Sequence, residues 1–78
     1  MNTMSHATDL QLLQERLTAL GVPASHYSLG KNRDERTCLV EDCDGWVVYY
    51  SERGRRESLQ AFSSFAEASE HIVGLLNP

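Results

Sequence analysis

Leucines recur every three or four residues near the start of the chain, and this spacing predicts an amphipathic helix over residues 8–20. Thr8 followed by Gln11 resembles a capping box at its start. At its end, Gly21 suits the left-handed position after a helix, and Pro23 prevents continuation. The apolar stripe consists of Leu10, Leu13, Leu17 and Leu20.

A second apolar stripe of helical spacing lies near the end of the chain and predicts a helix that ends near Leu76. Ser64 with Glu67 has the capping-box pattern at its start. The stripe consists of Phe65, Ala68, Ile72 and Leu75.

Between the helices, β-forming residues predict strands over 26–30, 37–42 and 46–51, and 58–62 is either a fourth strand or extended chain. Asp44-Gly45 is a strong hairpin signal, whereas 31–36 and 52–57 are expected to be charged loops. The sequence therefore predicts a single small α+β domain over 8–78. Its antiparallel sheet has three strands, or four if 58–62 pairs, and two helices pack on one face, in the order α-β-β-β-(β)-α. Residues 1–7 are expected to form a flexible tail.

The predicted two-residue turn at Asp44-Gly45 fixes which side chains share a face, because side chains alternate along a strand. It places Cys43 opposite Trp46, and the face that carries Trp46 is expected to meet the helices because it has the larger side chains. The other face then carries Val40, Val47 and Tyr49 together, as an exposed apolar patch of the kind that marks interaction sites. The alternative is that the segment from residue 52 to Phe62, or the N-terminal tail, covers this patch.

The chain carries eleven acidic and seven basic residues, for a net charge of −4, which disfavours nucleic acid and anionic membranes as partners. An α-β-β-β-α order also belongs to double-stranded-RNA-binding domains, but the predicted last helix has no Lys or Arg for phosphate. No apolar run is long enough to span a membrane, and the first residues do not resemble a signal peptide, so a cytoplasmic location is expected.

No pattern of catalytic or ligand-binding residues is found. The histidines His6, His26 and His71 lie apart from any serine or cysteine signature, and no phosphate-binding glycine motif occurs. If 37–43 is a strand, Cys38 and Cys43 are roughly 16 Å apart, too far for a disulfide. Both are expected to be buried structural thiols, and no enzyme activity, metal or cofactor is expected.

Several short segments resemble small bacterial immunity proteins, which are encoded beside polymorphic or contact-dependent growth inhibition toxins. The most specific segment runs from Asp44-Gly45-Trp46 through Tyr49-Tyr50-Ser51-Glu52-Arg53-Gly54. Further elements are Gly21-Val22-Pro23, Tyr27-Ser28-Leu29-Gly30, Cys38-Leu39, Phe62, Glu67 and Ala68.

The resemblance implies a cytosolic protein that binds the C-terminal domain of its toxin and neutralises it. The contact is expected either at the open sheet face with an arginine rim, or at the acidic hairpin tip, which would enter a basic cleft. The alternative is a homodimeric structural or regulatory module in which the same sheet face pairs with itself. The candidate partner-binding residues are Val40, Asp42, Asp44, Val47, Tyr49, Arg53, Arg55 and Arg56.

Overall fold

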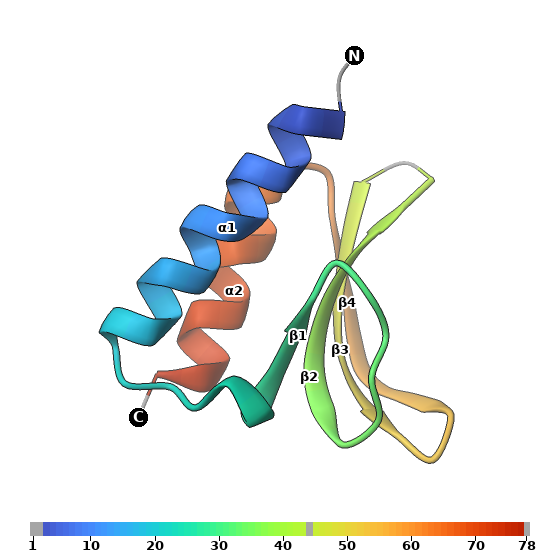
Figure 1. Cartoon of the computed structure of the whole chain (residues 1–78). Coiled ribbons are helices and arrows are strands. Elements are labelled where there is room, and N and C mark those ends of the chain that lie inside the picture. The colour runs from blue at the N-terminus through green and yellow to red at the C-terminus, as the bar shows by residue number, and fades with distance from the viewer. Residues whose placement is uncertain (1–2, 44, 78) are drawn as a thin grey trace.

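The computed structural model describes residues 3–43 and 45–77, with side chains from residue 8 onward. The described residues form two α-helices and a four-stranded sheet in the order α-β-β-β-β-α, which confirms the predicted α+β class. Both helices lie against one face of the sheet (Figure 1). The elements are α1 (Thr3–Ala19), β1 (Tyr27–Leu29), β2 (Arg36–Asp42), β3 (Gly45–Glu52), β4 (Arg55–Phe62) and α2 (Phe65–Leu76).

Helix α1 begins earlier than its sequence suggests and ends where expected. It starts at Thr3, so Thr8 is an interior residue and the capping-box interpretation of Thr8 is wrong. At its end Gly21 takes a φ of 85°, and its N–H bonds to the Thr18 carbonyl while the Val22 N–H bonds to the Leu17 carbonyl. This pair of bonds is a Schellman motif, and it satisfies carbonyls that the helix leaves open.

Helix α2 starts as predicted. Ser64 is the N-cap, and its hydroxyl accepts a hydrogen bond of 3.2 Å from the Glu67 backbone N–H. Ser63 donates to the Glu67 carboxylate at 3.3 Å, so both serines hold this residue at the first turn. A carboxylate in that position also suits the positive end of the helix dipole.

The sheet has the strand order β1-β2-β3-β4, and its only parallel pair among the described residues is β1 with β2. The expectation of a wholly antiparallel sheet is therefore wrong. Parallel neighbours ordinarily need a long crossover. Here β1 has only three residues, so residues 30–35 suffice to return the chain from the end of β1 to the start of β2.

The β2–β3 hairpin differs from its predicted register by two residues. Asp42 pairs with Gly45 and Val40 with Val47, so Cys43 does not face Trp46. The predicted faces nevertheless hold, because a shift of two residues returns every side chain to its original side. Gly45 belongs to the strand, and a Cβ there would collide with the Phe62 carbonyl oxygen. Asp44 lies outside the described residues.

The β3–β4 connection is a two-residue turn at Arg53 and Gly54, which have φ values of 52° and 79°. Two positive φ values are typical of the type I′ turn that matches the twist of a hairpin. The expected loop over 52–57 is therefore wrong beyond this turn: Arg55 and Arg56 lie in β4. The open question about 58–62 is resolved, because these residues form the second half of that strand.

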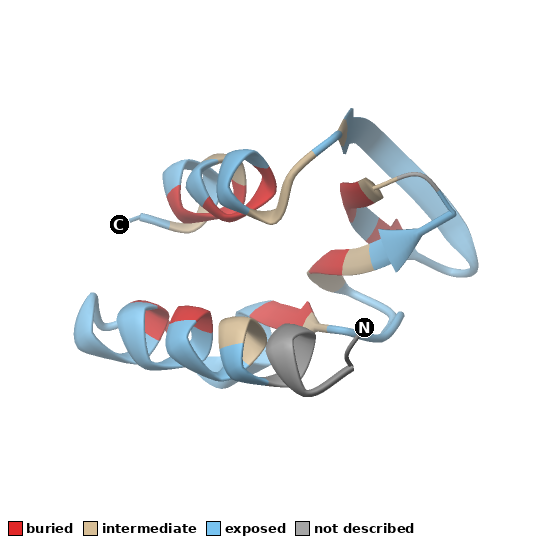
Figure 2. Cartoon of the chain, turned by 90° about the horizontal axis from the view of Figure 1, so that it is seen from above, coloured by how far each residue is buried: buried red, intermediate tan, exposed pale blue. Residues whose placement is uncertain are grey.

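The main core lies between the helices and the face of the sheet that carries Trp46, as predicted (Figure 2). We call this the helix-side face. The Trp46 and Phe65 rings meet edge to face with centroids 5.0 Å apart. The buried members are Leu13, Leu17, Val22, Tyr27, Leu39, Trp46, Val48, Ala68, Ile72 and Val73.

A second, smaller core lies on the opposite face of the sheet, which we call the loop-side face. Cys38, Val47 and Tyr49 are exposed by only 0%, 4% and 1%, with Val40 packed against them. The expected exposed apolar patch is therefore wrong. The loop of residues 31–35 runs over this face between β1 and β2 (Figure 1). Arg56, from the 52–62 segment proposed as a cover, also lies over the Tyr49 ring.

Polar contacts fasten that loop to the strands below it. The Tyr49 hydroxyl donates to Asn32 at 2.7 Å, and the Ser51 hydroxyl donates to the Asp34 carboxylate at 3.1 Å. The Cys38 thiol lies 3.5 Å from the Arg33 N–H and 3.4 Å from the Arg33 carbonyl. Backbone and side-chain groups of this loop thus provide hydrogen-bond partners for the buried polar atoms of Cys38, Tyr49 and Ser51.

Candidate partner-binding surface

Ala61–Ser63, at the end of β4 and the start of the connection to α2, lines two adjoining hollows in the surface. One hollow, of about 360 Å³, is shared with the β2–β3 hairpin. The other, of about 680 Å³, is shared with the first turns of α2. Their apolar walls come from Trp46, Val47, Ala61, Phe62 and Ala66.

Each hollow has at least one carboxylate in its lining. Asp42 lines the hairpin hollow, and Glu67 and Glu70 line the hollow beside α2. We call this set, Asp42, Glu67 and Glu70 around Ala61–Ser63, the acidic surface. It combines apolar area with negative charge on its rim, which is the composition of a protein-binding patch.

One of these carboxylates also joins the two helices. Arg16 of α1 donates to Glu70 at 2.7 Å and 3.4 Å, and both side chains are largely exposed. The Arg16 guanidinium lowers the pKa of the Glu70 carboxyl, chiefly through the hydrogen bond and secondly through its charge. Glu70 therefore keeps its charge to a lower pH than an unpaired glutamate would.

The candidate arginines lie at the other end of β3 and β4. Arg53, Arg55 and Arg56 are exposed around the turn, and β3 separates them from Asp42 by roughly 24 Å. Arg56 stacks over the Tyr49 ring with its guanidinium carbon 4.7 Å from the centroid. The structure thus does not unite the predicted residues into one site.

Val47 and Tyr49 belong to the second core. Burial raises the pKa of the Tyr49 hydroxyl, and Cys38 adds to the rise while the Arg56 charge opposes it. Cys38 is buried as predicted, but Cys43 is exposed, so that half of the thiol prediction is wrong; both described thiols are free. The predicted Asp44 contact falls outside the described residues.

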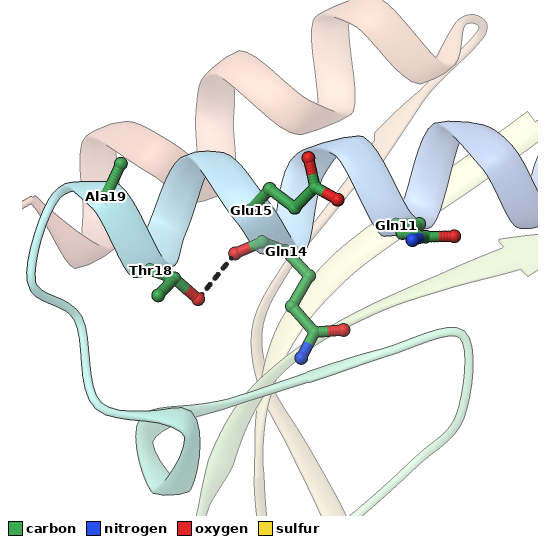
Figure 3. A pocket seen from close by; sticks show the side chains of 5 residues that line it. All are labelled: Gln11, Gln14, Glu15, Thr18 and Ala19. Carbon is green, nitrogen blue, oxygen red and sulfur yellow. Dashed lines mark hydrogen bonds between the residues drawn. The ribbon is translucent and has the colours of Figure 1, made fainter.

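A further hollow, of about 430 Å³, lies on α1 and offers no site for chemistry (Figure 3). Its lining side chains all come from this one helix and point in different directions, and Thr18 donates to the Gln14 carbonyl at 2.9 Å. Within residues 3–43 and 45–77, no group of three or more histidine, cysteine or acidic side chains is placed to hold a metal ion. No helix of that part of the chain has the length and apolar character to cross a bilayer.

Sequence reasoning missed the contribution of Glu67 and Glu70 to the acidic surface. Their signal was present in the charge of the last helix, which has carboxylates and no Lys or Arg. What joins them to Asp42 is the close approach of Gly45 to Phe62. No local residue pattern predicts the contact between Gly45 and Phe62, because it depends on the pairing of β3 with β4.

Comparison of the chain with protein-family models, curated proteins and solved structures found no match.

Proposed function

We propose that this chain is an immunity protein that binds and neutralises a basic toxin domain through its acidic surface. The observation that carries the proposal is the pair of carboxylate-rimmed apolar hollows that meet at Ala61–Ser63. Apolar walls supply contact area, while the surrounding carboxylates select a partner of opposite charge and speed its approach. The resemblance to immunity proteins supplies the kind of partner: a toxin domain in the cytosol of the producing cell.

The acidic surface is a better candidate than the second core. Tyr49 lies beneath residues 31–35, so a partner would have to displace its hydrogen bond to Asn32 and that of Ser51 to Asp34 to reach it. Asp42 is exposed and needs no rearrangement. Of the two contacts considered from the sequence, the acidic hairpin tip is thus favoured, extended by the carboxylates of α2.

The test is growth rescue by co-expression with the C-terminal domain of the toxin encoded next to this chain, followed by a binding titration. Asp42→Asn with Glu67→Gln should weaken binding roughly tenfold, because two interfacial charge contacts are worth about 1.4 kcal/mol together. The affinity of the unchanged protein should fall as salt is added.

Glu15→Gln with Glu52→Gln is the matched control, because it removes the same charge from exposed positions outside the acidic surface. It should leave rescue and affinity unchanged. Equal weakening by both pairs would mean that only net charge matters. Failure of the chain to rescue growth or to bind the neighbouring toxin domain would refute the proposal itself.

A further inference from the structure

Strand β4 is a long edge strand with an unusual degree of exposure. It pairs with β3 on one side, and no other described strand lies on its outer side. Every residue from Arg55 to Ala61 is exposed, including Leu59 at 43%. Natural proteins keep edge strands short or protect them with charge, proline or a β-bulge, and of these β4 has one bulge and the charges of residues 55–57. The opposite edge, β1, has three residues, whereas β4 has eight, and Ser58–Phe62 carries neither charge nor proline.

We propose that β4 pairs antiparallel with β4 of a second copy of this chain across a two-fold axis, which joins the two sheets into one. This inference goes beyond toxin binding and does not depend on it. Two observations support the pairing of this edge with a second copy. One is the position of a β-bulge in the middle of the strand, and the other is the charge at its two ends.

The irregularity is a β-bulge at the centre of β4. Val48 pairs with Gln60 and Tyr50 with Glu57, so Ser58 and Leu59 together face Tyr49; Ser58 has a φ of 57°. The bulge sets the faces of the strand. Arg55, Glu57, Gln60 and Phe62 lie on the helix-side face, and Arg56, Leu59 and Ala61 lie on the loop-side face.

A two-fold axis through the bulge pairs all eight residues and matches their faces. Phe62 then lies opposite Arg55 of the second copy, Ala61 opposite Arg56, and Gln60 opposite Glu57. The two bulges meet at the axis, where the exposed Leu59 side chains of the two copies come together. Such isologous pairing is the common geometry of protein dimers.

The charges of the monomer favour this antiparallel arrangement over a parallel one. The arginines are at the start of β4, and the acidic surface is at its end. Reversal of the second copy brings its Arg55 to the hollow lined by Phe62 and Glu67, and its Arg56 to the hollow lined by Ala61 and Asp42. A parallel pair would instead place arginine beside arginine, which is destabilising. A basic toxin and a second copy would thus compete for the acidic surface.

The test is light scattering and sedimentation of the purified chain over a range of concentrations. The unchanged protein should form a dimer. Arg55→Glu should weaken the dimer roughly tenfold or more, since the two-fold axis repeats each unfavourable contact with Glu67. Glu67→Arg should do the same. Lys31→Glu, with the same charge change at an exposed position next to β1, the opposite edge of the sheet, should have no effect.

Mixing the two reversed variants gives the decisive measurement. In a mixed dimer, the reversed side chains face each other at one contact, and the natural pair of Arg55 and Glu67 is kept at the other. Equimolar Arg55→Glu and Glu67→Arg should therefore recover dimers, and circular dichroism of each variant alone should show that it is folded. A chain that stays monomeric at all concentrations, or a dimer that Arg55→Glu and Leu59→Lys leave intact, would overturn the proposal.

Discussion

Adjacent valines on opposite faces of β3 allow a sharp test of the second core. Val47 is 4% exposed and belongs to the core under the 31–35 loop, whereas Val48 is 0% exposed and belongs to the main core beneath the helices. Replacement of each by alanine makes the same chemical change in the two cores. We expect both replacements to destabilise the domain to a similar extent.

The magnitude follows from the groups removed. Valine to alanine deletes the equivalent of two methylenes, worth about 0.8 kcal/mol each when buried. The cavity left behind adds to that loss, which brings the expected decrease in the free energy of unfolding to about 2 kcal/mol. If the loop-side face were open to solvent, Val47→Ala would instead change stability by no more than about 0.5 kcal/mol.

Urea unfolding followed by Trp46 fluorescence measures the difference at one fixed protein concentration, because a dimer would make stability depend on concentration. With a denaturant slope of about 1 kcal/mol per molar for a domain of this size, each midpoint should fall by roughly 2 M. A Val47→Ala midpoint within about 0.5 M of the unchanged protein, with a normal fall for Val48→Ala, would refute the covering role of the loop.

Three further predictions follow from the backbone and from Tyr49. Gly45→Ala should lower the free energy of unfolding by about 1–3 kcal/mol, because the new Cβ would meet the Phe62 carbonyl. Gly74→Ala, at an exposed helix position with open space, should raise the free energy of unfolding by about 1 kcal/mol. Thermal melts that give the same sign for both substitutions would contradict this. Gly21→Ala should lower it by about 1–2 kcal/mol, because a Cβ there has room but disfavours the left-handed φ, and an unchanged denaturation midpoint would count against the Schellman end. Burial raises the pKa of Tyr49, so its neutral form stabilises the fold fully below the unfolded-state pKa of about 10, and this stability is lost as pH rises through the higher folded-state pKa. Tyr49→Phe should lower stability by about 1 kcal/mol at neutral pH through the lost bond to Asn32 and should flatten the alkaline decline; an alkaline profile identical to that of the unchanged protein would argue against this.

The features that sequence predicted well were local or periodic. The left-handed Gly21 and the Ser64 cap each depend on a few consecutive residues, so the residue types alone determine them. The division of β3 into a Trp46 side and a Val47 side was also correct despite the wrong hairpin register. The error was two residues, and the period of a strand is two.

The features that sequence missed depend on contacts between distant residues. Residues 31–35 have the composition of an ordinary charged loop. No local pattern predicts that Asn32 and Asp34 will bond to β3 and hold the loop over the sheet. The parallel pairing of β1 has the same cause, since the loop returns the chain to the start of β2. The acidic surface was half predicted: Asp42 was expected at the hairpin tip, but Glu67 joins it only through the β3–β4 pairing.

The 31–35 loop has a consequence for how this small protein opens. A sheet face is ordinarily sealed by a second layer of helices or strands, and exposing it requires that layer to unfold. Here the short 31–35 loop covers the face and is bonded to the strands chiefly through Asn32, Asp34 and the backbone of Arg33. The loop can therefore lift while α1 and α2 remain packed on the other face. We therefore expect the amide hydrogens of Arg33 and Glu35, which bond to the Cys38 thiol and the Ser51 carbonyl, to exchange before those of the main core, whereas the strand amides beneath the loop stay protected by the sheet.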